Sequence, residues 1–584
     1  MKRKILMIYP QIPPTYWSFK YALPFIGKKA AIPPLGLLTV AALLPPSYDV
    51  KLIDMNVHPL SDEEIAEADL VFISAMIVQK NSFAQVAKQC KNLGATVVAG
   101  GPYPSSSYQT IEHIDHFVLN EAEITLPHFF QDLEIGRAKQ IYNDHGKADI
   151  KNSPAPRFDL IKMSDYHTMP LQYSRGCPFN CEFCDIIEMF GHQMRTKTNQ
   201  QIIKELKILF YLGWRGSVFI VDDNFIGHKR NVKELLPVIA QWQRKHHYPF
   251  DLFTEASINL ADDPELLDLM SAAGFNMVFV GIETPDKNTL VSTGKKQNTK
   301  GDLLQSVATI QSKGIEVAGG FIVGFDSDPS DIFDRQIEFI QQSGIVLAMV
   351  GLLTALPNTQ LYRRLEQEGR LLAESTGNNT HDLSLNFQPK IALQQILDGY
   401  KHIIEHIYSP KAYFDRSLTF LMNLHPHQNS ARKVKREEII AFIKSIAKQG
   451  FSSYSFYYWR FLIKAFLIEP RMFPEAVRLA IMGYHFFVIT QQIIAVDELK
   501  KNYDIDELKC QYQKLISNIR NFDSPAKLRE LKIVTDSLIA EITERYSDIH
   551  KDFRDLASEW YKNTINLLNE LYQNYSSQVS EGCG

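Results

Sequence analysis

Short apolar runs alternate with stretches of helical periodicity through the first part of the chain. We expect each run to be a buried strand, and the runs in residues 1–135 are 5–9, 50–54, 70–74, 96–99 and 117–119. Strands separated by helices form a parallel sheet covered on both faces, and such a doubly wound sheet binds ligands at the carboxyl ends of its strands. Ser74, Gly100 and Gly101 stand at two of these ends, and they are candidate ligand-binding residues.

A polar connector, residues 136–165, precedes a second set of strands and helices in residues 166–370. The expected strands here are 171–174, 217–221, 252–255, 277–282, 317–323 and 346–353. Six strand–helix units predict a partial (β/α)6 barrel of the TIM type, whose chemistry lies on the loops at the carboxyl ends of the strands. Three of these strands end in carboxylates, namely Asp222, Asp223, Glu255 and Glu283.

The rest of the chain, residues 371–584, has the heptad-like apolar spacing of a helical domain. Between residues 451 and 488 it is unusually rich in aromatic side chains. Two interpretations of this segment stay open. The aromatic residues pack in a helical core, or they form an apolar wall or a ledge at a membrane surface for a greasy substrate, with Lys464, Arg471 and Arg478 facing lipid headgroups.

Composition narrows the class of protein further. The chain has 584 residues, 45% of them hydrophobic and 22% charged, which suits a globular protein of three or four domains. A formal net charge of −4 gives no electrostatic footprint for nucleic acid. The first apolar run is too short for a signal peptide, and the most apolar stretch, 479–496, contains enough polar residues to favour a buried helix over a membrane span. Few cysteines, clustered rather than paired, suit the cytoplasm.

Three of the cysteines carry the strongest chemical signal. Cys177, Cys181 and Cys184 form a CxxxCxxC motif on the loop after the first expected barrel strand. Three thiolates on one short loop can hold a [4Fe-4S] cluster and leave one iron open for a small molecule. The alternative is a structural zinc site, in which His192 completes a tetrahedral Cys3His set.

The cysteine motif, with Phe183 before its last cysteine, resembles the signature of the radical S-adenosylmethionine (SAM) enzymes. The resemblance implies that SAM chelates the open iron and that electron transfer splits its C5′–S bond to give a deoxyadenosyl radical. It also implies the positions of further SAM contacts: Asp222 and Asp223 beside the methionine end, Glu255 in the cavity, Glu283 at the ribose hydroxyls, and Gly320 and Ile322 at the adenine. The paired Asp residues could instead cap a helix. A buried Glu283 requires either a ligand or a cation as partner.

The first domain resembles the cobalamin-binding domain that precedes the radical SAM domain in one large subfamily. The resemblance rests on 33–38, 52–54, 71–75 and 99–102. The DxHxxG motif of the family is absent after the first strand, so no histidine of that motif is expected to ligate cobalt, and its GExE motif stands here as Asn120-Glu121-Ala122-Glu123. A flavodoxin-like domain that binds no corrin is the alternative, since fold alone does not fix function.

Four later segments, 351–359, 361–365, 368–370 and 386–389, resemble the branch of this family that contains the hopanoid methylases and many uncharacterised relatives. The resemblance implies a cobalamin-dependent methyltransferase that acts on an unactivated carbon of a small-molecule or lipid-like substrate. Its electron donor would be a flavodoxin or ferredoxin, and its location the cytoplasm, with peripheral membrane contact left open. Redox, rearrangement or ring-forming chemistry at cobalamin, and a non-catalytic zinc-stabilised binding protein, are the alternatives.

Overall fold

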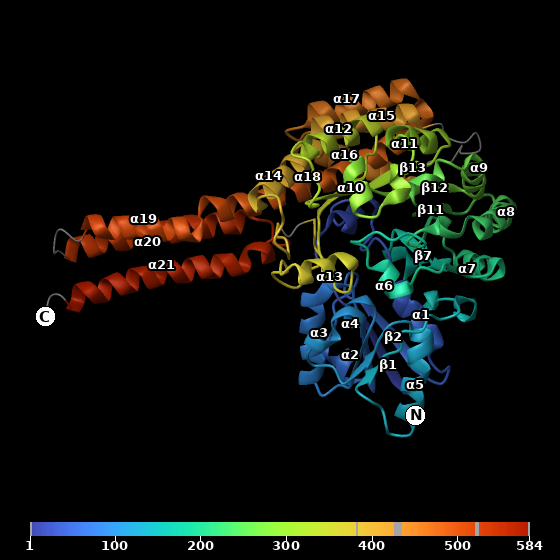
Figure 1. Cartoon of the computed structure of the whole chain (residues 1–584), viewed down its shortest axis with the longest axis horizontal. Coiled ribbons are helices and arrows are strands. Elements are labelled where there is room, and N and C mark those ends of the chain that lie inside the picture. Colours follow the sequence, from blue (N-terminus) through green and yellow to red (C-terminus); the bar gives the residue numbers. More distant parts are fainter. Residues whose placement is uncertain (1–2, 381–382, 425–434, 520–524, 582–584) are drawn as a thin grey trace. The chain divides into compact units, whose positions relative to one another are not determined.

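The computed structural model describes residues 3–380, 383–424, 435–519 and 525–581 (Figure 1). The chain divides into two compact units, Met1–Phe486 and Phe487–Gly584. The first unit contains both parallel sheets, and the second is helical. The α/β class and the helical carboxyl-terminal region are therefore as the sequence predicts.

The first sheet is parallel throughout and has the strand order β2-β1-β3-β4-β5-β6. Its strands are β1 (Lys4–Tyr9), β2 (Asp49–Asp54), β3 (Leu70–Ser74), β4 (Val97–Gly100), β5 (His116–Val118) and β6 (Ile141–Tyr142). Each expected strand lies within one residue of an observed one. The order reverses between β1 and β3, which makes the carboxyl ends of these strands the place where a doubly wound sheet binds its ligand.

Helices cover both faces of this sheet, because successive apolar side chains of β1 point to opposite faces. Ile5 and Met7 pack on the side of α1 (Leu35–Leu43) and α5 (Ala122–Glu134), whereas Leu6 and Ile8 pack on the side of α3 (Lys80–Asn92). Two shorter helices, α2 (Asp62–Ala66) and α4 (Pro102–Ser107), complete the layer structure. Adjacent residues of a strand point to opposite faces, so an apolar run without alternation indicates a sheet buried on both sides.

The expected linker, residues 136–165, contains β6 and three 3-10 helices. β6 pairs in parallel with β5 and extends the first sheet. A strand of two residues, one of them exposed, produces no apolar run, so the sequence pattern could not reveal it. The division into domains at residues 135, 165 and 370 stays a prediction.

The second sheet has six parallel strands in the order β14-β13-β12-β11-β10-β7. These are β7 (Thr168–Leu171), β10 (Ser217–Ile220), β11 (Asp251–Glu255), β12 (Phe275–Glu283), β13 (Glu316–Val323) and β14 (Ala348–Leu352). The helices between and after them are α7 (Asn199–Tyr211), α8 (Lys229–Lys245), α9 (Pro264–Ala273), α10 (Lys287–Ser292), α11 (Leu303–Ser312), α12 (Ile332–Ser343) and α13 (Gln360–Gln367). This is the predicted six-unit partial barrel, although its first strand ends at Leu171, where the expected strand 171–174 begins.

A small antiparallel ribbon interrupts the first strand–helix unit. β8 (Ser174–Arg175) pairs with β9 (Arg195–Thr196), and the loop between them carries the three motif cysteines and the short helix α6 (Ile186–Phe190). The ribbon closes the cysteine loop at its base.

Four helices follow the barrel within the first unit: α14 (Leu393–Ile407), α15 (Pro410–Asn423), α16 (Arg436–Gln449) and α17 (Ser455–Ile468). Tyr458 and Phe461 of the aromatic segment are buried, as the core interpretation predicts, whereas Phe456 is exposed. The interpretation as a wall or ledge for a greasy substrate stays a prediction. The expectation for Arg478 is wrong. Its side chain lies in the wall of an internal cavity and forms ion pairs with Glu316 and Glu475, whose charges satisfy the guanidinium without a lipid headgroup.

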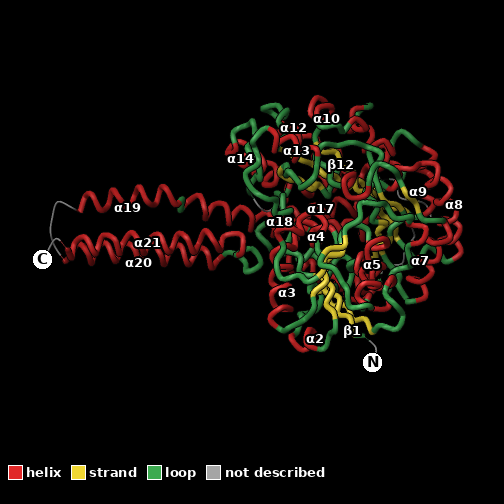
Figure 2. The backbone as a smooth tube through the Cα atoms, turned by 60° about the horizontal axis from the view of Figure 1, so that its bottom comes forward, coloured by secondary structure: helices red, strands yellow, loops and turns green. Residues whose placement is uncertain are grey.

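The second unit consists of long helices (Figure 2). α20 (Pro525–Asp548) and α21 (Asp555–Glu581) lie side by side and α19 (Ile505–Ile519) contacts α21, while α18 (Phe473–Asn502) crosses the boundary between the units. The helical stretch Pro470–Lys514 contains the one candidate membrane span found among the described residues, by length and composition. In its most apolar window 61% of the residues are buried, which is typical of a core helix.

Candidate functional site

The three motif cysteines lie on a tightly turned loop between β8 and α6. Gly176, directly before Cys177, has φ = +99°, and a Cβ atom there would lie 2.7 Å from the carbonyl oxygen of Gln193. Only glycine fits both the conformation and the space. The N–H of Cys177 donates to the carbonyl oxygen of Gly191 at 3.2 Å, and the N–H of Cys184 donates to that of Cys181 at 3.2 Å. The backbone thus fixes the loop from both ends.

Burial and one cation determine the electrostatics of this loop. Burial raises the pKa of all three thiols. The ammonium group of Lys295 acts in the opposite direction on each of them, and the side-chain amide of Gln297 donates to Cys181 Sγ at 3.7 Å. A positive charge and an N–H donor beside buried sulfurs stabilise thiolates, the form that binds metal.

The arrangement of the thiols bears on the kind of metal centre. A tetrahedral zinc site requires three thiolates and His192 to converge on a single point. Among the described residues, no three His, Cys, Asp or Glu side chains form a group that could hold one metal ion. In a [4Fe-4S] cluster each thiolate binds a different iron, so the sulfurs surround a volume instead of a point. The cluster needs only the three thiolates of this loop, whereas zinc would need His192 as well.

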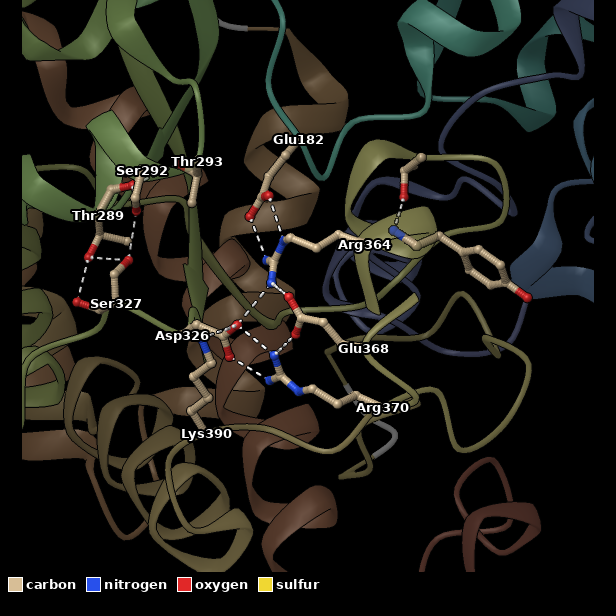
Figure 3. Close-up of polar contacts among 12 residues, drawn as sticks. Glu182, Thr289, Ser292, Thr293, Asp326, Ser327, Arg364, Glu368, Arg370 and Lys390 are labelled. Carbon is tan, nitrogen blue, oxygen red and sulfur yellow. Dashed lines mark hydrogen bonds and ion pairs between the residues drawn. The ribbon is translucent and has the colours of Figure 1, made fainter. Parts of the chain in front are cut away.

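A network of ion pairs holds the cysteine loop against α13 (Figure 3). Glu182, between the second and third cysteines, accepts two hydrogen bonds from the guanidinium of Arg364, at 3.1 and 3.3 Å. Arg364 and Arg370 both donate to Asp326, at 3.1 and 2.6 Å, and each also pairs with Glu368. Burial alone would raise the pKa of Asp326, but the two guanidinium groups bring it down to about 2.

A second set of ion pairs links the cysteine loop to the first sheet. Arg175 of β8 donates to Glu121 at 2.8 Å and to Glu123 at 2.7 and 3.1 Å, while Arg195 of β9 pairs with Glu121 at 2.8 Å. All four side chains are largely buried. Planar guanidinium groups that bind carboxylates with two parallel bonds fix both distance and direction. The turn after β5 and the cysteine loop are therefore joined as one polar unit.

The loops at the carboxyl ends of β3 and β4 approach each other closely. Gly101 has φ = +93°, and a Cβ atom there would lie 2.3 Å from Ser74 Oγ. A Cβ atom on Gly100 would lie 2.8 Å from the carbonyl oxygen of Val118. Both glycines are therefore required by the fold, and the backbone they leave uncovered lines a cavity together with Ser74.

This cavity, of about 3370 Å³, is continuous from the loops of the first sheet to the interior of the barrel. Its wall includes Ser74, Gly100 and Gly101 on one side and Asp223 and Glu255 on the other. Five of the predicted site residues thus meet in one space. The remaining predicted residues, the three cysteines included, are not part of its described wall, although Arg175 and Ile186 next to the cysteines are.

Family models match three parts of the chain. Residues 29–130 match the B12 binding domain, residues 171–354 the radical SAM superfamily, and residues 359–498 a domain of unknown function, DUF4070. The first match contains β2 to β5 of the first sheet, the second contains β10 to β14 of the second sheet, and the third begins at α13.

Two curated relatives are similar over almost their whole length. An uncharacterized methyltransferase of Synechocystis sp., sll1242, is 41% identical over 84% of this chain and 93% of its own, and the hopanoid C-2 methylase of Rhodopseudomonas palustris is 32% identical over 86% and 96%. The chain belongs to the cobalamin-dependent radical SAM methyltransferases. The predicted family, enzyme class and cofactors (a [4Fe-4S] cluster, SAM and cobalamin) are confirmed.

Solved structures share the fold of this methyltransferase. One is the radical SAM methyltransferase TsrM of Kitasatospora setae, with cobalamin and a [4Fe-4S] cluster bound. The match has a TM-score of 0.53 at 15% identity and covers 82% of this chain and 99% of TsrM. The cobalamin-dependent radical enzyme OxsB, with aqua-cobalamin and SAM bound, matches 99% of the chain with a TM-score of 0.53 at 14% identity, and 84% of OxsB is covered.

Three carboxylates of the methyltransferase differ in their surroundings. Asp222 accepts hydrogen bonds from the Tyr173 N–H at 2.7 Å and the Ser174 hydroxyl at 2.6 Å, so it ties the end of β10 to the turn after β7. Asp223 and Glu255 face the cavity instead. Burial and neighbouring carboxylates raise the pKa of Asp223 to about 7 and that of Glu255 to about 8. A cationic group in the cavity, such as the ammonium or sulfonium of SAM, would favour the charged form of both side chains.

Glu283 has a partner that the sequence did not reveal. Its carboxylate lies 2.6 Å from the ammonium of Lys295, and both side chains are buried. Glu283 has φ = +66°, rare for a residue other than glycine, and a Cβ atom on Gly281 would lie 2.3 Å from its Oε1. The chain itself therefore supplies the cation that a buried carboxylate needs. A second partner on SAM stays a prediction.

Gly320 and Ile322 lie on the inward-facing side of β13. A Cβ atom on Gly320 would lie 2.8 Å from the Phe279 ring, so glycine makes room for that ring. The carbonyl oxygen of Ile322 accepts a hydrogen bond from the Gln336 side chain at 2.8 Å. A contact between this strand and adenine stays a prediction, as do the roles of the other predicted site residues.

Sequence reasoning missed the positioning residues Lys295, Arg175, Arg195 and Arg364. One local signal existed, since Arg175 directly precedes the Gly-Cys of the motif and Glu121 and Glu123 occupy the GExE-like turn. Charges of opposite sign next to two cofactor motifs suggest a pairing. Nothing local indicates which residues pair, because the partners lie more than 50 positions apart.

Proposed function

We propose that this methyltransferase acts on an unactivated carbon of an apolar, polycyclic lipid-like molecule. The observation that supports the substrate class is the aromatic lining of the cavity inside the barrel. Phe219 and Phe253 stack with ring centroids 4.6 Å apart and an interplanar angle of 3°, and the Phe279 ring lies 5.0 Å from that of Trp17. All four side chains belong to the cavity wall.

Such a wall recognises its ligand by area and shape. Phe219 of β10 and Phe253 of β11 are register partners, and Phe279 of β12 lies two residues beyond Met277, the register partner of Phe253. Burying a fused, hydrogen-rich ring system against flat aromatic rings gains roughly 25 cal/mol for each Å² removed from water. The name of the hopanoid C-2 methylase, a relative over almost its full length, supports the same substrate class.

The chain's own residues would hold each cofactor in a stated place. Cys177, Cys181 and Cys184 would ligate the cluster, and Asp223 and Glu255 would face the cationic end of SAM. The backbone around Gly100 would admit the cobalamin tail, with no histidine of the DxHxxG motif as lower ligand. When bound, these cofactors supply a radical that removes hydrogen and a methyl group that replaces it. The protein orients the substrate and excludes water from the radical.

The electrons would come from a flavodoxin or ferredoxin, and the enzyme would work in the cytoplasm. Redox, rearrangement or ring-forming chemistry at cobalamin is the second candidate. The names of both nearly full-length relatives, a methyltransferase and a methylase, favour methyl transfer.

The test is an anaerobic incubation of the reconstituted enzyme with a pentacyclic hopanoid, a reductant and SAM labelled in its methyl group. We expect a product in which one labelled methyl group replaces a hydrogen atom of the hopanoid. The Phe253→Ala variant should not form this product, whereas Tyr211→Ala, a surface control outside the cavity, should still form it. A loaded enzyme that cleaves SAM but neither binds nor methylates the hopanoid would overturn the substrate class.

A further inference from the structure

The helices α16 and α17 form a hairpin on the surface of the first unit. The Tyr458 and Ser445 hydroxyls are 3.1 Å apart, and the Phe473 ring lies between Phe442 of α16 and Phe466 of α17, with centroids 5.5 and 5.8 Å away. The two helices therefore present a common outer surface to solvent.

α17 is apolar on both of its sides. One side packs into the protein through Tyr458, Phe461, Leu462 and Ala465. The other side carries Phe456, Trp459, Ile463 and Phe466, which follow one another at helical spacing and are all exposed. A helix that is hydrophobic all round is normally buried completely, in a protein core or in lipid.

Exposed apolar side chains extend this surface onto neighbouring segments. We define the α16–α17 apolar face as the exposed hydrophobic residues Ile439, Ile440, Ile443, Phe451, Phe456, Trp459, Ile463, Phe466, Leu467 and Ile468. Single exposed hydrophobic residues are ordinary, but ten of them on two successive helices and the turn between them mark an interaction site.

The charge around the face points to its partner. Residues 435–472 contain seven Lys and Arg and three Asp and Glu, a formal net charge of +4 within a chain whose net charge is −4. Lys448 and Lys464 are exposed within the hairpin itself. Bulky apolar side chains flanked by basic residues are the composition of helices that lie in the interface of an anionic bilayer.

The face is also continuous with the cavity. Ile439, Phe466 and Ile468 of the α16–α17 apolar face belong to the cavity wall, and so does Arg471, whereas Phe219 and Phe253 line the same cavity inside the barrel. We infer that the α16–α17 apolar face docks on an anionic lipid bilayer and opens the cavity toward it. Docking stands independently of the reaction; the delivery of an apolar substrate from the bilayer rests on the proposed function.

The test is flotation of the purified full-length chain with vesicles. We expect binding to vesicles of equal parts phosphatidylcholine and phosphatidylglycerol, and weaker binding to phosphatidylcholine alone or at high salt. The triple variant Phe456→Gln, Ile463→Gln, Leu467→Gln replaces side chains that are 71, 58 and 75% exposed, none of them in the cavity wall. Its partition coefficient should fall roughly tenfold or more.

A matched control separates docking from a general loss of surface hydrophobicity. The triple variant Ile135→Gln, Tyr211→Gln, Leu372→Gln changes side chains of similar exposure elsewhere and should bind like the unchanged protein. Circular dichroism should show equal helicity for all three proteins. Lys448→Glu with Lys464→Glu should weaken binding only to the anionic vesicles.

Two outcomes of flotation would overturn the inference: no vesicle binding by the unchanged chain, or an equal loss of vesicle binding in both triple variants. A third would be the absence of vesicle binding together with a dimer in sedimentation that only the α17 triple variant fails to form. The last would make the face a contact between two copies of this chain. Flotation needs no turnover, so a failed methylation assay leaves the docking result intact, and the reverse also holds.

Discussion

Replacing Arg175 with Met should destabilise the first unit by about 3 kcal/mol, the usual cost of removing one partner from a buried ion pair. Arg175 makes three hydrogen bonds to Glu121 and Glu123 from a side chain that is only 11% exposed. After the substitution Glu121 keeps Arg195, but Glu123 keeps only uncharged donors, the Ser153 hydroxyl and its own backbone N–H. The loss of stability therefore arises mainly at Glu123, whose buried charge no longer has a guanidinium partner.

The pKa of Glu123 gives a second estimate of the same quantity. Burial raises this pKa, but the hydrogen bonds and charge of Arg175 bring it from 4.5 down to about 2. At about 1.4 kcal/mol for each pKa unit, this shift also corresponds to roughly 3 kcal/mol. Because the folded-state pKa is the lower one, the contribution is complete above pH 4.5 and is lost as the pH falls through about 2.

The assay is urea unfolding of the apoprotein at neutral and acidic pH, with iron content after reconstitution as a second measurement. The stability difference between the unchanged protein and Arg175→Met should be largest at neutral pH and shrink toward pH 2. Arg175→Lys keeps the charge without the planar fork and should fall between them. The matched control is Arg157→Met, which breaks an exposed pair with Asp159 and should cost at most about 1 kcal/mol. If Arg175→Met loses no more stability than Arg157→Met, the ion pairs between the cysteine loop and the first sheet do not stabilise the fold.

Replacing all three motif cysteines with Ala should abolish cluster absorbance and SAM cleavage while cobalamin still binds the first sheet; a triple variant that cleaves SAM would contradict the assignment. Electron paramagnetic resonance of the cob(II)alamin form should show no nitrogen splitting from an axial imidazole, and such splitting would disprove the absence of a histidine ligand. Glu283→Gln should weaken SAM binding by roughly 1 to 3 kcal/mol in a titration with normal cluster content, whereas unchanged affinity would leave Glu283 as the structural partner of Lys295. Burial and nearby carboxylates raise the pKa of Glu255 to about 8, so the apoprotein should lose stability as the pH rises from 4.5 to 8. In urea unfolding at a series of pH values, Glu255→Gln should show a smaller change of stability with pH. Identical pH profiles for the two proteins would refute the pKa shift.

Strands were predictable because the pattern that reveals them is local. A strand buried on both faces is a continuous apolar run, so 70–74 and 317–323 could be read directly from the sequence. The same reasoning failed for β6 and for the β8–β9 ribbon, whose strands of two residues are too short to show a period. Their existence depends on a partner strand, which a local pattern does not contain.

The site was predictable as chemistry and not as contacts. The spacing of the three cysteines predicts a metal centre, and the resemblance of the motif to the radical SAM signature indicates which one. The sequence indicated that a buried Glu283 needs a partner, but it did not indicate which one. The partner, Lys295, lies on a separate segment between α10 and α11. Arg478 shows the converse error. An apolar, aromatic neighbourhood suggested a surface position, but its helix turns the guanidinium inward to Glu316.

The ion pairs between Glu121, Glu123, Arg175 and Arg195 also constrain how this protein can be recombined. Each pair has one partner in the cobalamin-binding region and the other in the cysteine loop. A chimaera that takes its first 165 residues from another methyltransferase would bring a foreign turn to these two arginines and leave buried charges unmatched. The exchangeable piece of the molecule is therefore not a folded domain alone. It is the first sheet together with residues 174–196, so the boundary for building hybrids crosses the barrel and does not coincide with the linker.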